Sequence, residues 1–92
     1  MSGDPLAALR LRFRARALAD ADALATALGQ SDDKQIEAVS HGLAGAAGLF
    51  GFNEIGRQAK DIDGRFAAGA PPEKSDVEAL IAAIRRDMAA YS

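Results

Sequence analysis

The sequence holds one histidine, His41, and this is the side chain whose surroundings are most suggestive of chemistry. It stands before glycines that recur at three-residue intervals, Gly42, Gly45, Gly48 and Gly51. Each glycine inside a helix gives up about 1 kcal/mol of helix propensity relative to alanine, so the pattern needs a compensating role. On a helical wheel, Gly45 and Gly48 share the face of His41, opposite an apolar face formed by Ile36, Val39, Leu43, Ala47 and Phe50. We therefore expect an exposed imidazole that a second protein can approach closely.

An exposed imidazole has a pKa of about 6.5, so a large neutral fraction is present at physiological pH, and its free nitrogen is then a competent nucleophile. The chain has no cysteine and no second histidine, and Ser40 projects about 100° away on the wheel, which argues against a hydrolytic nucleophile–base pair. The glycines fit neither a phosphate-binding loop nor a dinucleotide fingerprint. We therefore expect a group carrier rather than an enzyme, with no cofactor and no metal of its own.

Composition limits the class of protein. The chain has 92 residues, 49% of them hydrophobic, and five aromatic residues, which predicts a single domain over residues 1–92 with a core of aliphatic side chains and alanine. A net charge of −2 gives no bulk attraction to nucleic acid or to an anionic membrane. The apolar stretch over residues 42–52 is too short and too rich in glycine to span a bilayer. We expect a cytoplasmic monomer without nucleic-acid or membrane partners.

The first expected helix begins at Asp4 and Pro5, a favourable cap and first-turn pair, and stops at Gly29. Its inward stripe is predicted to consist of Leu6, Leu9, Phe13, Ala17, Leu24 and Leu28. Arginines alternate through its early turns, at Arg10, Arg12, Arg14 and Arg16. Cations near a helix N-terminus oppose the macrodipole, so they are not there for helix stability. Two interpretations stay open: solvated arginines whose stems cover apolar neighbours, and docking to an acidic partner.

The second expected helix begins at Ser31 and Asp32 and runs through the glycine-rich segment towards Phe50. Gly51 suits a left-handed position after the helix, and Phe52 is the apolar residue that often folds back behind such a stop. Phe50 and Phe52 are most simply interpreted as core residues.

Two further helices follow. Asn53 is expected to cap the third helix, which ends near Gly69 and has a core seam of Ile55, Ala59, Ile62 and Phe66. The sequence S-D-V-E at residues 75–78 is a capping box that opens the last helix, whose inward residues are Val77, Leu80, Ile81, Ile84 and Met88. Four helices joined by short loops predict an all-α, antiparallel up-and-down four-helix bundle.

From His41 to Asp63 the chain reads H-G-L-A-G-A-A-G-L-F-G-F-N-E-I-G-R-Q-A-K-D-I-D, which resembles the histidine-containing phosphotransfer (HPt) domain of two-component signalling. The G-L-F-G-F segment is similar to the phosphotransfer domain of chemotaxis histidine kinases. The resemblance implies that His41 takes a phosphoryl group from a kinase or a receiver-domain aspartate and passes it to another receiver aspartate. It implies a response-regulator receiver domain, a histidine kinase or both as partners, with Mg²⁺ supplied only by the receiver.

One position departs from the family. HPt domains usually have lysine three residues after the histidine, as in H-x-L-K-G, where it helps to orient the phosphoryl group, and this chain has Ala44. In similar domains the positions of Lys60 and Asp63 lie beside the histidine, and the wheel places both off the core seam. We predict that Asp63 accepts a hydrogen bond from Nδ1–H of His41, which leaves Nε2 free, and that Lys60 supplies the missing cation. A simple solvated salt-bridge face is the alternative for both residues.

The sequence thus predicts a phosphorelay intermediate with Gly45, Gly48 and Ala44 as its docking and access surface. The rival hypothesis is a degenerate HPt fold that binds a kinase or a receiver and regulates it without being phosphorylated. Ala44 is the feature that favours this rival. An autonomous kinase or phosphatase is disfavoured, because no nucleotide-binding or metal-binding motif is visible.

Overall fold

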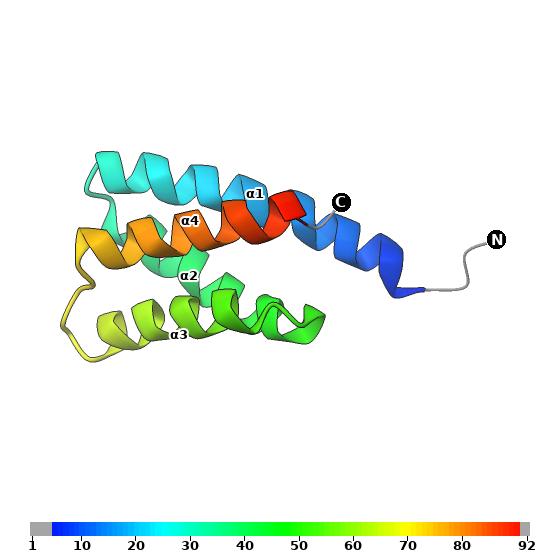
Figure 1. The fold of residues 1–92 in the computed structure, drawn as a ribbon. Helices are drawn as coiled ribbons and strands as arrows, with labels where there is room; N and C mark the ends of the chain where they lie inside the picture. Colours follow the sequence, from blue (N-terminus) through cyan, green and yellow to red (C-terminus); the bar gives the residue numbers. More distant parts are fainter. Residues whose placement is uncertain (1–4, 91–92) are drawn as a thin grey trace.

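The computed structural model describes residues 5–90, and helices account for almost all of this part of the chain. Their bounds are α1 (Leu6–Gly29), α2 (Asp33–Ala47), the short 3₁₀ helix η1 (Gly48–Phe50), α3 (Asn53–Ala67) and α4 (Lys74–Ala90). Successive long helices run in opposite directions and lie side by side (Figure 1). The prediction of an all-α antiparallel bundle is confirmed. Among the described helices, none is long and apolar enough to cross a bilayer.

The core consists of aliphatic side chains and alanines, with Phe13 as its buried aromatic ring. The predicted inward residues of α4 are all buried, and so is the α3 seam except for Phe66, which is half-buried against the core. Alanines contribute one side of the α1 interface, at Ala17, Ala21 and Ala27. Small residues on α1 let its neighbours approach closely, which suits a chain with few aromatic rings.

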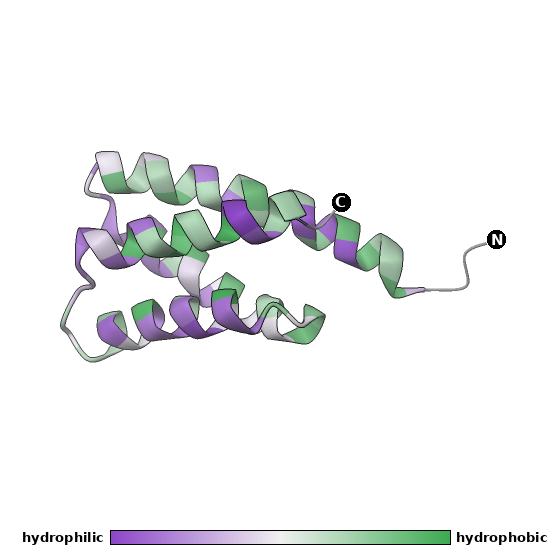
Figure 2. Cartoon of the chain, viewed as in Figure 1, coloured by the Kyte–Doolittle hydropathy of each residue, from purple (hydrophilic) through white to green (hydrophobic). Residues whose placement is uncertain are grey.

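The first turns of α1 project beyond the ends of the neighbouring helices (Figure 1). Hydrophobic and hydrophilic bands alternate along this projecting part (Figure 2). Leu6 is 46% exposed and Leu9 is 43% exposed, so the prediction that they lie in the core is wrong. Their spacing continues the inward stripe correctly, but the neighbouring helices end before they can cover it. Asp4 lies outside the described residues, and Pro5 occupies the cap position without a side-chain hydrogen bond.

Gly29 is predicted to be the left-handed residue that follows α1, and the helix extends two residues further than this prediction implies. Gly29 is the last residue of the helix, and the left-handed position falls on Ser31, with φ of 55°. Asp32 then donates its backbone N–H to the carbonyl oxygen of Ala27 at 2.8 Å, and its carboxylate caps α2 by accepting from the N–H of Gln35 at 3.2 Å. The need to place Asp32 at this cap sets the turn, which overrides the preference for glycine at the left-handed position.

The turn after α2 is the predicted left-handed stop. Gly51 has φ of 84°, and Phe52 donates its N–H to the carbonyl oxygen of Ala47 at 3.0 Å. The rings of Phe50 and Phe52 stack on Phe13 with centroids 5.2 and 5.4 Å apart. The α-helical part ends at Ala47, three residues earlier than expected, because the last turn tightens into η1.

Both later helix starts are displaced from the predicted caps. Asn53 is the first residue of α3 and Phe52 holds the cap position, with no side-chain hydrogen bond. The helix α4 begins at Lys74 rather than at the predicted capping box, because the carboxylate of Asp76 reaches back to accept from the N–H of Glu73 at 3.0 Å. The predicted end of α3 is correct, with Gly69 at φ of 75°.

Candidate phosphohistidine site

His41 lies in the middle of α2 with its side chain directed away from the core. Leu43 and Ala47, on the opposite face of the same helix, are fully buried. The side chain of His41 is 78% exposed. The apolar face of α2 therefore fixes the rotation of the helix and presents the imidazole to solvent, as its place on the wheel predicts.

Asp63 on α3 holds one nitrogen of this imidazole. Its Oδ2 atom lies 3.0 Å from Nδ1 of His41, and the carboxyl side chain is 29% exposed. This hydrogen bond, followed by the negative charge of Asp63, raises the pKa of His41 above its ordinary value of 6.5, with a smaller contribution from Glu37. In the neutral ring, Nδ1–H donates to Asp63 and Nε2 keeps its lone pair. The contact is the one expected from the sequence; its part in phosphoryl transfer stays a prediction.

Glycines set the register between α2 and α3. A Cβ atom added to Gly56 would lie 3.5 Å from the backbone nitrogen of Gly48, so the two backbones approach each other closely there. His41 precedes Gly48 by seven residues, and Asp63 follows Gly56 by seven residues. Since the two helices are antiparallel and rise equally per residue, the close approach of the glycines brings Asp63 level with His41.

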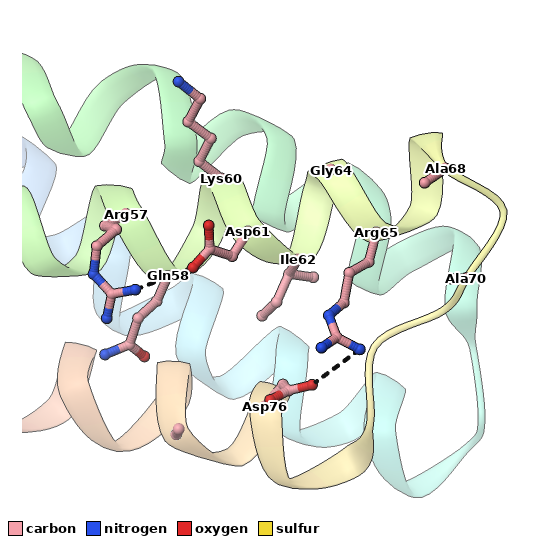
Figure 3. A pocket seen from close by; sticks show the side chains of 11 residues that line it. Arg57, Gln58, Lys60, Asp61, Ile62, Gly64, Arg65, Ala68, Ala70 and Asp76 are labelled. Atoms are coloured by element: carbon pink, nitrogen blue, oxygen red, sulfur yellow. Dashed lines mark hydrogen bonds and ion pairs between the residues drawn. The ribbon is translucent and has the colours of Figure 1, made fainter.

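The same register applies to Lys60. It lies three residues before Asp63, and Ala44 lies three residues after His41, so Lys60 is level with Ala44. Lys60 leaves α3 on the side away from Arg57 and Arg65 (Figure 3). It is exposed and makes no hydrogen bond or ion pair with another residue of the 5–90 segment. The structure therefore places Lys60 level with Ala44 and does not join it to His41, so its role stays a prediction.

Access to His41 is open on its C-terminal side. A Cβ atom added to Gly45 or Gly48 would have no neighbour within 4 Å. Ala44, in contrast, is half-buried and packs against the core, so it contributes less to this surface than the two glycines. Leu49, which no motif in the sequence singles out, is 82% exposed beside Gly48. The feature that could have identified it is its apolar side chain, which follows the glycines and lies outside the core stripe.

Ser40, which the wheel separates from His41, is a second residue with an unexpected environment. It is fully buried next to His41, and its Oγ atom has no hydrogen-bond partner among the described residues. Within the described part of the chain, no group of three histidine, cysteine or acidic side chains is arranged to hold a metal ion. The chemistry available at this surface is thus that of one imidazole, one carboxylate and nearby cations.

Comparison with known proteins identifies the family of this chain. The family model of the Hpt domain matches residues 8–91, nearly the whole chain. The chain therefore belongs to the Hpt domain family, whose members are histidine phosphotransfer modules of two-component signalling and interact with histidine kinases and receiver domains. Neither the curated proteins nor the solved structures gave a significant match.

Proposed function

We propose that this protein accepts a phosphoryl group on Nε2 of His41 and donates it to a receiver-domain aspartate. The observation that carries the proposal is an imidazole that is 78% exposed and held through Nδ1 by Asp63, so that Nε2 is the nitrogen left for reaction. The protein is then a carrier in a phosphorelay rather than an enzyme, and we place it in the cytoplasm as a monomer.

The transfer step uses the lone pair of Nε2. In-line attack on an aspartyl phosphate forms the N–P bond while the P–O bond breaks, and the aspartate leaves as a carboxylate. The imidazole becomes positively charged, and Asp63, 3.0 Å from Nδ1, stabilises that charge and keeps the ring in place. Donation to the next receiver reverses these events. The receiver supplies Mg²⁺, so this chain needs a positioned nucleophile and a docking surface.

Lys60 is the proposed replacement for the lysine that HPt domains usually have at the position of Ala44. Being three residues from Asp63, it is displaced from the level of His41 by about 4.5 Å along the helix axis. A lysine side chain extends about 6 Å on a flexible stem, which is enough to cover that displacement. Because Lys60 has no partner within the described segment, it can turn towards a phosphoryl group without breaking an ion pair.

The docking surface in this proposal consists of Gly45, Gly48 and Leu49. The two glycines let the backbone of a receiver approach the imidazole, and Leu49 offers a large apolar side chain that is 82% exposed. Burial of this exposed side chain against a partner would remove apolar surface from water, which favours association.

The test is incubation with a phosphorylated receiver or its kinase, with His41→Gln as the control. We expect an acid-labile label on the wild type and none on the variant. The rival function, a regulatory module that binds without being phosphorylated, is favoured by Ala44. Equal binding of wild type and variant to the partner, with no label on either, would support that rival and contradict the proposal.

A further inference from the structure

Gly42, the residue after the phosphoacceptor, is in contact with an arginine from another helix. A Cβ atom added to Gly42 would lie 2.7 Å from Nη2 of Arg16, which comes from α1. At the other glycines of residues 5–90, an added Cβ atom would meet nothing closer than 3.5 Å. Gly42 therefore admits a guanidinium group that any larger residue would displace.

This contact places a cation close to His41. A Cβ atom lies about 1.5 Å from its Cα atom and successive Cα atoms are about 3.8 Å apart, so Nη2 of Arg16 lies within about 8 Å of the Cα atom of His41. That separation is about one Debye length at physiological ionic strength. The charge of Arg16 therefore acts on an anion carried by His41, and its long side chain can close the remaining distance.

The orientation of the imidazole favours Arg16 further. Nδ1 faces Asp63 on α3. The two nitrogens stand on different sides of the ring, so Nε2 points away from α3. The helix α1 packs against α2 from its other flank, and Arg16 reaches α2 there, over Gly42. A phosphoryl group on Nε2 would thus extend away from Asp63, and Arg16 offers a cation on the flank that α3 does not occupy.

Arg16 is only loosely held in the absence of a phosphoryl group. Its Nε atom lies 3.5 Å from Oδ2 of Asp20, one turn further along α1, and its side chain is 52% exposed. Asp20 is the more buried partner, with 21% exposure. A guanidinium has five N–H donors, and one long ion pair leaves most of them available for phosphate oxygens.

We propose that Arg16 binds the phosphoryl group on Nε2 of His41 from the α1 flank, and that Gly42 is the opening through which it reaches the group. The inference deepens the proposed function and rests on it. Arg16 would then be a second cation beside the phosphoacceptor, on the side opposite to Lys60.

Phosphoramidate tests the role of Arg16 without any partner protein. It is a small phosphoryl donor whose P–N bond breaks with release of ammonia as the Nε2–P bond forms. The rate of phosphohistidine formation on the full chain, its half-life and its phosphorus chemical shift would be followed by ³¹P NMR. We expect Arg16→Gln to slow formation about tenfold, as for loss of a charge-assisted hydrogen bond. We also expect the ³¹P resonance of phosphohistidine in this variant to differ in chemical shift from that of the wild type.

Arg12→Gln is the matched control, because Arg12 lies one turn earlier on the same flank of α1 and should leave rate and resonance unchanged. Arg16→Lys keeps the positive charge but loses the planar set of N–H donors of the guanidinium, so it should give an intermediate rate. Gly42→Ala should slow the reaction while Arg16 is still present, because the new methyl group takes the place of the guanidinium.

Equal rates and resonances for Arg16→Gln and the wild type would overturn this inference and leave the proposed function intact. A normal rate for the double variant Arg16→Gln/Asp20→Asn, beside a slow single variant, would also overturn it, because the effect would then come from an uncompensated Asp20. If the wild type itself forms no phosphohistidine, the result contradicts the proposed function, and with it the inference that rests on that function.

Discussion

The helix α3 carries two groups of paired charges that look similar in sequence and differ in their consequences. In the first, Asp63 joins α3 to His41 on α2, 22 residues away. In the second, Arg57 bonds to Glu54 at 3.1 Å and to Asp61 at 3.0 Å, all within α3. The second group lies beside the open groove between α3 and α4 (Figure 3). The first pair depends on the register of two helices, whereas the second forms wherever α3 is helical.

The two groups also differ in the pH range over which they change charge. Hydrogen bonds from Arg57 and then Gln58 lower the pKa of Glu54 from 4.5 to about 2, so this group stays fully charged near neutral pH. The hydrogen bond to Asp63, followed by its negative charge, raises the pKa of His41 above its ordinary value of 6.5. The pair within α3 therefore loses its charge only in strong acid, whereas the pKa of His41 moves upward from 6.5.

The largest effect should follow from removing Asp63. In Asp63→Asn the amide keeps the size of the side chain but cannot stabilise the charged ring, so we expect transfer from a phosphorylated receiver to slow about 10- to 100-fold. Arg57→Gln is the control from the other charge group and should leave the rate within about twofold. Quench-flow or gel autoradiography of the label would measure both. Equal losses in the two variants would show that the pairs do not differ as argued.

The register of α2 and α3 is tested by Gly56→Leu. Its side chain must enter the space beside the backbone nitrogen of Gly48, 3.5 Å from the position of an added Cβ atom. We expect the unfolding free energy to fall by about 1–3 kcal/mol in urea denaturation. We also expect the raised pKa of His41 to fall towards its ordinary value as Asp63 is moved away. Gly64→Leu is the control, because an added Cβ atom there meets nothing within 4 Å.

An NMR titration sharpens the difference in pH behaviour. Because the folded state raises the pKa of His41, its contribution to stability is complete below pH 6.5 and disappears as pH rises through the raised value. Glu54 behaves oppositely: its contribution is present above pH 4.5 and disappears as pH falls through about 2. In Asp63→Asn the pKa of His41 should decrease, and the pH below which phosphorylation slows should decrease with it. An unchanged His41 titration would contradict the role of Asp63.

The order of helices could be predicted because periodicity is strong in seams such as Ile55 and Ala59, where every turn repeats the pattern. Asp63 could be predicted as the partner of His41, because the helical wheel and the family resemblance both place it on the flank that faces His41. Periodicity does not say where a neighbouring helix ends, which is why Leu9 was wrongly assigned to the core. The approach of Arg16 to Gly42 depends on how two helices cross, and no local pattern in the sequence records that crossing.

The smallest expected effect concerns Ser40, which shares the centre of α2 with His41 but has no polar partner among the described residues. Its buried hydroxyl gives up hydration without a replacement hydrogen bond, and serine is a weaker helix former than alanine. We therefore expect Ser40→Ala to raise the unfolding free energy by about 1 kcal/mol in urea denaturation, with the pKa of His41 unchanged. A loss of stability would show that the hydroxyl is bonded in solution. A changed pKa would show that the site depends on residues beneath α2 as well as on the pair with Asp63.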